Sequence, residues 1–185
     1  MHESALKFAT TALDASEVAG KAVVECGSQD VNGSARPAIE ALGPASYTGV
    51  DMAPGHRVDL VASVPDLPAL LGSGTADVVV STEMLEHAAD WQACMAAMIG
   101  LLAPGGLLVI TTRSAGFPYH PYPTDEWRYS VEAMGQIMAA AGLEVLRLEH
   151  DWEAPGVFVK ARKPAGWEWP APPATAWAGI EVTRP

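Results

Sequence analysis

The sequence predicts an α/β fold in which a doubly wound, mostly parallel sheet of seven strands carries helices on both faces and ends in an antiparallel hairpin. Short apolar runs alternate with segments of helical periodicity, a pattern typical of βαβ units. The run Val78-Val79-Val80 is apolar at successive positions, as expected of a parallel strand covered on both faces. Only the segment 149–155 separates the last two apolar runs, which is short enough for an antiparallel hairpin.

The predicted strands are short, apolar and mostly bounded by glycine, proline or polar residues. They cover 22–26, 47–51, 58–62, 76–81, 107–111, 145–148 and 157–161. The predicted helices show apolar residues at helical spacing or lie between capping residues. They cover 1–20, 34–42, 67–71, 91–102 and 130–141. Ser34 and Ser130 are expected N-caps, and Pro104-Gly105-Gly106 is expected to end the fourth helix.

A single domain is expected over 1–163, followed by a tail, 164–185, that is rich in proline, alanine and tryptophan and has no periodicity. The tail could pack across the edge strand of the sheet, mediate self-association, or be loosely ordered.

The bulk composition excludes several classes of protein. The chain of 185 residues is 49% hydrophobic and 18% charged, which is typical of a globular protein rather than a disordered one. Its net charge of −11, without a cluster of lysines or arginines, argues against a nucleic-acid partner. No apolar run is long enough to cross a membrane and no signal peptide is visible, so we expect no membrane partner and a cytoplasmic location. Cys26 and Cys94 suggest no disulfide framework.

Polar residues follow the central strands, at the edge of the sheet where doubly wound folds bind ligands. Gly27 and Gly33 bracket a loop after the first strand, and Asp51 ends the second strand. A carboxylate at that point can accept hydrogen bonds from two ribose hydroxyls. The loop lacks the three glycines of G-x-G-x-x-G, which argues against a nicotinamide dehydrogenase.

Four motifs in this order resemble class I S-adenosylmethionine-dependent methyltransferases. Segment 23–33 resembles the first motif of the family, Asp51 its ribose-binding acid, 76–87 its fourth-strand motif, and 102–110 its fifth strand with the typical Pro-Gly-Gly. The resemblance covers about residues 20 to 162 and implies a Rossmann-like methyltransferase fold.

The resemblance also implies a cofactor, S-adenosylmethionine, which leaves as S-adenosylhomocysteine. The positions that match its binding residues are Glu25, Gly27, Ser28, Gln29, Asp51, Met52, Ser63, Val64, Thr82 and Glu83. Gln29 replaces a usual glycine, and Ser63 replaces a common aspartate that holds the adenine amino group. Asp30 and Asn32 could contact the ligand or only organise the turn.

Two histidines are candidate general bases. His87 follows the fourth strand, where it could act as the base or hold the start of the next helix. His120 lies in the aromatic segment 113–130, which we interpret as an acceptor pocket or lid. The predicted substrate-binding residues there are Tyr119, Trp127, Arg128 and Tyr129. The alternative is a loop whose aromatic side chains only cover the sheet edge.

No metal site is expected. The carboxylates and imidazoles near the fourth and fifth strands could bind a divalent ion in principle, but no two of them lie at a strong ligand spacing. These residues are Glu83, Glu86, His87, His120 and Asp125.

The leading functional hypothesis is methyl transfer to an oxygen, nitrogen or carbon of a small-molecule acceptor. A short lid would leave the pocket open, or completed by a second subunit in a homodimer. The alternatives are a non-catalytic protein of the same fold that binds a ligand or serves as a partner subunit, and an enzyme that uses another adenosine cofactor.

Overall fold

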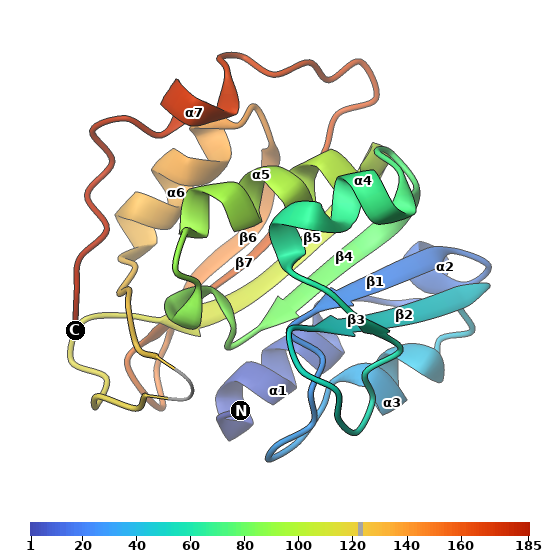
Figure 1. Cartoon of the computed structure of the whole chain (residues 1–185), viewed down its shortest axis with the longest axis horizontal. Coiled ribbons are helices and arrows are strands. Elements are labelled where there is room, and N and C mark those ends of the chain that lie inside the picture. Colours follow the sequence, from blue (N-terminus) through green and yellow to red (C-terminus); the bar gives the residue numbers. More distant parts are fainter. Residues whose placement is uncertain (122–123) are drawn as a thin grey trace.

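The computed structural model describes residues 1–121 and 124–185, and strands of these residues form one sheet of seven in the order β3-β2-β1-β4-β5-β7-β6 (Figure 1). The strands are β1 (Ala22–Cys26), β2 (Ser46–Asp51), β3 (Leu60–Val61), β4 (Ala76–Thr82), β5 (Leu102–Arg113), β6 (Glu144–Asp151) and β7 (Gly156–Arg162). Strands β1 to β5 pair in parallel, whereas β7 pairs antiparallel with both β5 and β6. The predicted fold class and terminal hairpin are confirmed. The antiparallel strand lies one place inside the edge, because β6 forms the edge itself.

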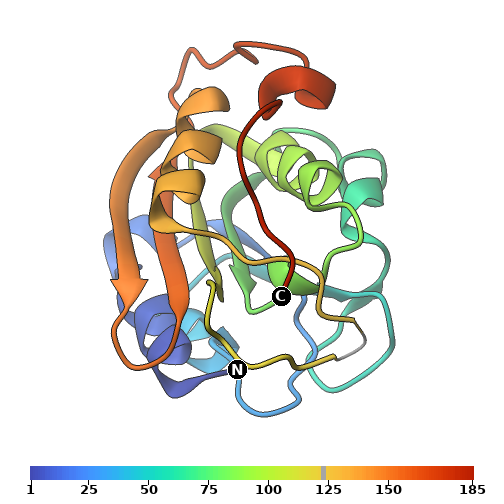
Figure 2. The ribbon, with the colours of Figure 1, turned by 90° about the vertical axis from the view of Figure 1, so that its left-hand side faces the viewer.

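Helices cover both faces of the sheet (Figures 1 and 2). One face carries α1 (Glu3–Thr11), α2 (Ala15–Val18) and α3 (Arg36–Glu40). The other carries α4 (Leu67–Leu71), α5 (Trp91–Leu101) and α6 (Val131–Ala140). Short 3₁₀ turns, η1 (Val64–Asp66) and η2 (Leu85–His87), precede α4 and α5. No helix among the described residues has both the length and the apolarity that a membrane span requires.

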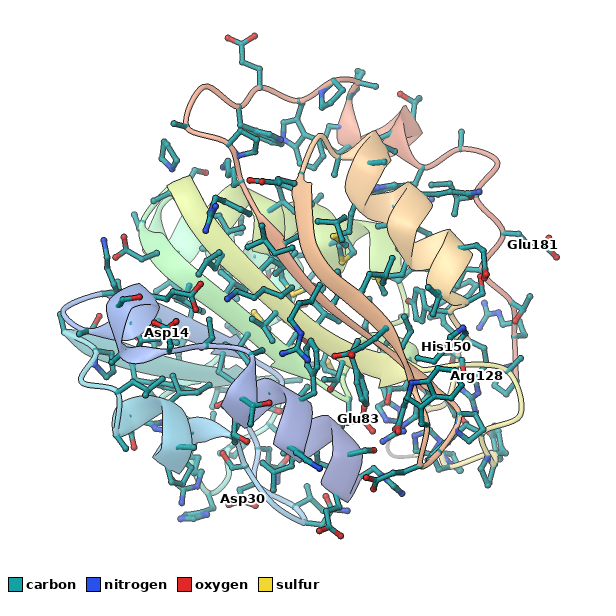
Figure 3. The ribbon with its side chains drawn as sticks, turned by 180° about the vertical axis from the view of Figure 1, so that it is seen from behind. Asp14, Asp30, Glu83, Arg128, His150 and Glu181 are labelled. Atoms are coloured by element: carbon teal, nitrogen blue, oxygen red, sulfur yellow. The ribbon has the colours of Figure 1, made fainter. Side chains whose placement is uncertain are left out.

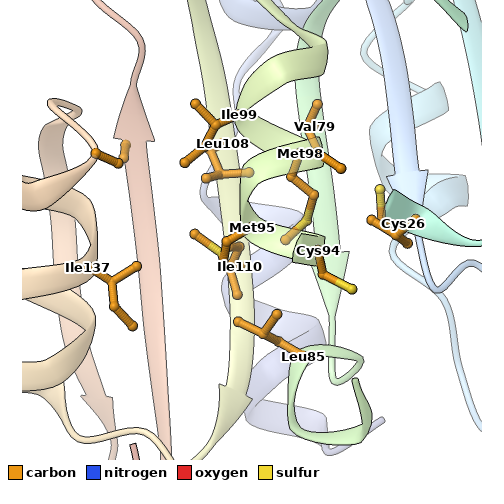
Figure 4. Packing of buried hydrophobic residues seen from close by; sticks show 14 of the residues in the cluster. Cys26, Val79, Leu85, Cys94, Met95, Met98, Ile99, Leu108, Ile110 and Ile137 are labelled. Atoms are coloured by element: carbon orange, nitrogen blue, oxygen red, sulfur yellow. The ribbon is translucent and has the colours of Figure 1, made fainter. Parts of the chain in front are cut away.

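Two apolar clusters fill the space between the sheet and its helices, because successive side chains of a strand point to opposite faces. Val78 and Val80 pack with α1 and α3, and Val79 packs with α5. Figure 4 shows the second cluster, in which Met95 and Met98 of α5 lie over β4 and β5. The continuous valine run is therefore covered on both sides, as its composition predicts.

The N-terminal helix predicted over 1–20 is wrong in one respect: the chain forms two helices there. Asp14 ends the first segment because its side chain caps α2, accepting the N–H of Ser16, while Glu17 accepts the N–H of Asp14 in return. Such a capping box starts a new helix in a new direction. The third helix is also shorter than predicted, since Ala35 rather than Ser34 is the N-cap of α3.

The Pro-Gly-Gly sequence lies inside β5 and does not end α5, which corrects a second expectation. Leu102 is already extended, and the pairing of β4 with β5 shifts register between Leu102 and Leu107. Gly105 takes a positive φ of 82° and donates its N–H to the carbonyl of Lys163. The segment is a local irregularity of the strand that only a glycine at 105 accommodates without strain.

The tryptophan-rich tail packs over α5 and α6, and not across the edge strand. It contains a short helix, α7 (Pro173–Ala176), and Trp177, which is only 1% exposed. The indole N–H of Trp177 donates to the carbonyl of Ile137 at 3.0 Å, and its ring lies 5.6 Å from that of Trp91. Burial of the large ring explains why this stretch is ordered without periodicity.

Candidate active site

The carboxyl-terminal ends of β1, β2, β4 and β5 lie side by side along one edge of the sheet, where the predicted site residues gather. This edge is formed by strand ends and is distinct from the edge strand β6. Cys26 of β1 pairs with Val50 of β2 and Ser81 of β4, so these strands end almost level. Figure 3 shows Glu83 and Arg128 close to this edge, with Asp30 on the loop after β1 at the same end of the molecule.

Gly27 connects β1 to the edge and contacts the segment after β4. Its φ is +80°, and a Cβ atom at this position would lie 2.6 Å from both Cβ and Cγ of Met84. Only glycine therefore lets the backbone of the β1 loop approach the β4 loop this closely. The loop after β1 and the loop after β4 are therefore in contact and together form one side of the candidate site.

Asp51 ends β2 with its carboxylate half-buried at the edge. One oxygen accepts the N–H of Gln29 at 3.2 Å, and the other accepts the N–H of Ala53 at 3.2 Å. A carboxylate oxygen can accept two hydrogen bonds, so each oxygen retains one free position. Beside it Met52 is 69% exposed and offers an apolar surface. The structure thus places Asp51 and Met52, both predicted cofactor-binding residues, together at the end of β2.

The loop after β1 is held against the loop after β2. Asp30 accepts the N–H of Gly33 at 2.9 Å and the Nε–H of Arg57 at 3.1 Å, so it organises the turn, as one of the two sequence interpretations proposed. The side chain of Gln29 lies over Gly55, where a Cβ would come within 2.8 Å of it.

The remaining predicted cofactor residues differ in accessibility. Ser63 is exposed beside η1, whereas Val64 belongs to the core and offers little surface. Ser28 is buried, and its hydroxyl has no hydrogen-bond partner within the described part of the chain. Thr82 is buried at the end of β4.

Glu25 lies below the edge on the β1 strand. It is 2% exposed and its carboxylate accepts a hydrogen bond from the Tyr47 hydroxyl at 3.0 Å. Burial raises its pKa to about 7, against a smaller lowering by the Tyr47 hydrogen bond. In this structure its carboxylate is buried and paired with Tyr47 of β2.

Glu83 is held in an unusual backbone conformation directly after β4. Its φ is +54°, a region that costs a non-glycine residue about 1 kcal/mol. Its carboxylate forms an ion pair with Arg113, which is fully buried, also pairs with Asp151 at 3.2 Å, and lies 4.3 Å from the Phe117 ring centre. Burial and the neighbouring Glu86 raise the pKa of Glu83 to about 7, while Arg113 lowers it. The strained residue is thus fixed by a buried charge network.

Glu86, His87 and His120 form a cluster at the same edge. Glu86 is fully buried, and its Oε1 lies 3.9 Å from Nε2 of His87 and 3.9 Å from Nε2 of His120. The two imidazole rings meet edge to face with centres 4.8 Å apart. The structure therefore brings together both predicted catalytic histidines, although they are far apart in the sequence.

In each residue of this cluster, the side-chain nitrogen or oxygen that does not face the other two residues is held by a neighbouring group. Nδ1 of His87 bonds to the carbonyl of Thr124, and Nδ1 of His120 lies 3.1 Å from Asp125. The hydroxyl of Thr112 donates to Oε2 of Glu86 at 2.8 Å. The carboxylates of Glu86 and Asp125 raise the pKa of His120 above its ordinary value.

Arg128 and Asp125 fasten the segment after β5 over the site. Arg128 is 2% exposed, and its guanidinium binds both oxygens of Asp125, one at 2.6 Å. Although burial raises the pKa of Asp125, the bonds from Arg128 and from the His120 N–H hold it at about 2. Arg128 therefore positions the loop that carries His120, and its paired guanidinium is not free for a substrate.

The other predicted substrate residues lie at different depths. Tyr119 is 67% exposed, and Trp127 is half-buried with its indole N–H bonded to the carbonyl of Ala88 at 2.7 Å. Tyr129 is fully buried and packs edge to face on Trp91, which corrects its expected role as a substrate contact. It lies beneath the site because the chain turns inward at this point to begin α6.

Two charged residues of the site, Arg113 and Glu86, are not singled out by the sequence pattern. A charged residue at the end of an apolar strand, as in the run 107–113, was the available signal for Arg113. For Glu86 the signal was its place beside His87.

Surface hollows elsewhere do not contain these residues. One of about 470 Å³ lies between α1 and α3 and is lined by Lys7 and Pro37, among others. Another of about 230 Å³ lies between α1 and the β6–β7 hairpin. Neither hollow is lined by Asp51 or His120.

Comparison with known proteins places the fold. The structure resembles the 1,6-didemethyltoxoflavin-N1-methyltransferase of Burkholderia thailandensis, solved with 1,6-didemethyltoxoflavin and S-adenosylhomocysteine (TM-score 0.72, 17% identity, 88% of this chain and 79% of that one). It also resembles an S-adenosylmethionine-dependent methyltransferase from Mesorhizobium loti (TM-score 0.65, 15% identity, 86% and 98%). A third similar chain belongs to the complex of the Haloferax volcanii Trm112 methyltransferase activator with a methyltransferase (TM-score 0.66, 18% identity, 90% and 91%).

A search of curated proteins finds no match. The family model described as a methyltransferase domain matches residues 7–152, which is most of the chain. The chain therefore belongs to the methyltransferase domain family, and its fold is that of the S-adenosylmethionine-dependent methyltransferases that its motifs resemble.

Proposed function

We propose that this protein transfers the methyl group of S-adenosylmethionine to an oxygen, nitrogen or carbon atom of a small-molecule acceptor. One observation carries the proposal: the family's glycine loop and strand-end carboxylate, Gly27 and Asp51, share an edge of the sheet with the cluster of Glu86, His87 and His120. The first pair suits a cofactor, and the cluster suits the acceptor.

The residues at the cofactor end fit an adenosine group. Asp51 retains one acceptor position on each oxygen, which suits two neighbouring ribose hydroxyls, and the exposed Met52 suits the adenine face. Gly27 keeps the wall free of a side chain. When bound, the cofactor supplies an electrophilic methyl group on a sulfonium.

The acceptor end requires alignment more than elaborate chemistry, because methyl transfer depends chiefly on in-line placement of the nucleophile. His87 and His120 both point Nε2 at the same carboxylate, so an acceptor here would contact two imidazoles. Tyr119 and Trp127 offer aromatic surface beside them. We assign the two histidines to positioning or deprotonating the acceptor, and the segment 113–130 to covering it.

The remaining parts of the proposal concern partners and location. A small-molecule acceptor agrees with the 1,6-didemethyltoxoflavin bound to the Burkholderia neighbour, and the acidic net charge of −11 disfavours nucleic acid. Cys26 and Cys94 are free and buried, which agrees with a reducing, cytoplasmic location. A homodimer could complete the lid.

Titration calorimetry with S-adenosylmethionine and S-adenosylhomocysteine tests the cofactor site. We expect binding by the wild type, and a weakening of about tenfold or more in Asp51→Ala, the value of a charge-assisted hydrogen bond. Glu144→Ala removes an exposed carboxylate at the start of β6, at the opposite end of the strands from Asp51, and should bind as the wild type does.

Two results would redirect the proposal. If the wild type bound neither S-adenosylmethionine nor S-adenosylhomocysteine, the proposal would be refuted. Binding without turnover on any acceptor would favour the non-catalytic partner subunit, for which Gln29 and Ser63, in place of the family's common glycine and aspartate, are the main argument.

A further inference from the structure

We propose that Glu86, His87 and His120 bind a divalent first-row metal ion, preferably Zn²⁺, at the acceptor end of the site. Metal binding itself stands on the geometry of these residues. The use of the ion, to hold an acceptor oxygen, rests on the proposed function.

The three ligand atoms converge on one point. One nitrogen of each imidazole and one carboxylate oxygen of Glu86 all lie within 4.8 Å of one another, with both nitrogen-to-oxygen distances at 3.9 Å. Ligands about 2.1 Å from a tetrahedral zinc ion lie about 3.4 Å apart. The two nitrogen-to-oxygen distances exceed this spacing by about 0.5 Å, and the widest separation in the cluster exceeds it by at most about 1.4 Å, so small rotations of the side chains would complete the site.

The hydrogen bonds around the cluster leave the correct nitrogen free on each histidine. A carbonyl oxygen only accepts hydrogen bonds, so Nδ1 of His87 carries the hydrogen that it donates to Thr124. Nδ1 of His120 likewise faces the ionised Asp125 and the carbonyl of Pro118, each at 3.1 Å. In a neutral imidazole the other nitrogen, Nε2, then keeps its lone pair. Metal-binding histidines typically show this arrangement, with the remote N–H held by a carboxylate or carbonyl.

Glu86 supplies an independent observation. Its Oε2 accepts the Thr112 hydroxyl at 2.8 Å, but its Oε1 has no hydrogen-bond partner among the described residues, although the side chain is fully buried. An ionised carboxylate oxygen left in this state is costly. A cation bound between Oε1 and the two imidazoles would remove that cost.

An ion pair between Glu86 and a protonated histidine is the competing explanation. At 3.9 Å the nitrogen and the oxygen are too far apart for a hydrogen bond, and one carboxylate oxygen would serve both rings. The ion pair would leave the cluster without affinity for metals, so the two explanations differ in a measurable way.

The ligand set also selects the ion and the acceptor. Two imidazoles with one carboxylate suit zinc and similar transition ions, whereas magnesium and calcium prefer oxygen ligands. Three protein ligands leave a coordination position open, as in catalytic zinc sites. A divalent ion lowers the pKa of a hydroxyl that it contacts, so the site favours an oxygen acceptor.

Calorimetric titration of untagged, metal-free protein with ZnCl₂, followed by Co²⁺ absorption spectra, tests the site. We expect one ion per chain, with affinity reduced about tenfold or more in His120→Ala and in Glu86→Gln. His120 is one-third exposed, so its variant should fold even if the substitution at the buried Glu86 does not. His150→Ala, which removes an exposed histidine on β6, serves as the matched control and should bind as the wild type.

The proposal is overturned if wild type and His120→Ala bind zinc equally, if the wild type does not bind it, or if millimolar Mg²⁺ displaces it. Titration of the same metal-free sample with S-adenosylmethionine separates the two proposals. Cofactor binding without zinc binding would sink this inference alone, and zinc binding without cofactor binding would sink the proposed function alone.

Discussion

At the scale of single residues, two glycines with similar backbones differ in their surroundings. Gly20 has φ +72° and nothing within 4 Å of the position a Cβ would occupy, whereas Gly27 has φ +80° and faces Met84 at 2.6 Å. We expect Gly20→Ala to lower the free energy of unfolding by about 1 kcal/mol, the cost of the left-handed backbone alone. Gly27→Ala should cost about 1–3 kcal/mol more, because the new methyl group also overpacks the site.

Urea denaturation of both variants measures this difference. Because the two substitutions share the backbone penalty, their difference isolates the contact with Met84. Equal losses in the two variants would mean that the β1 and β4 loops are not in contact in solution, and would weaken the cofactor-site assignment.

Glu25 predicts a pH dependence of stability. Its pKa is about 7 in the folded protein because of burial, and its ordinary value is near 4.5. An acid whose pKa rises on folding contributes stability that is present below about pH 4.5 and is lost as the pH rises through 7. Glu25→Gln escapes this loss. Its stability relative to the wild type should therefore increase from pH 5 to pH 8, by on the order of 2–3 kcal/mol.

Urea midpoints at about pH 5, 6, 7 and 8 give this curve. Glu132→Gln is the matched control, since Glu132 is exposed on α6 and its lowered pKa puts its titration below this window. A Glu25→Gln advantage that stays constant with pH would show that Glu25 ionises normally, and hence that its carboxylate is not buried as the structure has it.

At the scale of elements, the tail is a structural part of the helical layer. Trp177 buries its ring against α5 and α6 and donates to the carbonyl of Ile137. We expect Trp177→Ala to lower the free energy of unfolding by about 3–5 kcal/mol, as for other buried aromatic residues. Trp152 is 87% exposed, and Trp152→Ala should change it by less than about 0.5 kcal/mol. Chemical denaturation would contradict the packing if both substitutions had the same small effect.

At the scale of the whole molecule, the net charge of −11 predicts that the protein does not bind nucleic acid. Nucleic acid binding gains most of its free energy from phosphate neutralisation, which an acidic surface cannot supply. Fluorescence anisotropy with labelled DNA and RNA at about 50 mM and 150 mM salt should show no binding at micromolar protein. Binding that weakens steeply with salt would instead indicate a local basic patch and would return nucleic acids to the possible acceptors.

The sequence by itself determined the α/β class, the succession of the seven strands along the chain, and the terminal hairpin. These follow from local periodicity and from turn residues, which act over a few neighbouring positions. It also located Gly27 and Asp51, because each directly follows or ends a strand and strand ends share one edge. It misjudged Asp14 and Pro104-Gly105-Gly106, where capping and strand pairing outweighed simple propensity.

Only the tertiary structure decided which polar residues meet. Glu86 and His120 are separated by a helix and a strand, and no spacing rule connects them, yet the parallel pairing of β4 and β5 brings the segments that follow these strands together. Tyr129 is buried whereas Tyr119 is exposed, although both were predicted to contact the substrate. Arg128, also predicted to contact the substrate, instead pairs with Asp125 and holds the loop. The physical reason is that propensities and periodicities are local, whereas the burial, ionisation and convergence of a site depend on residues distant in sequence.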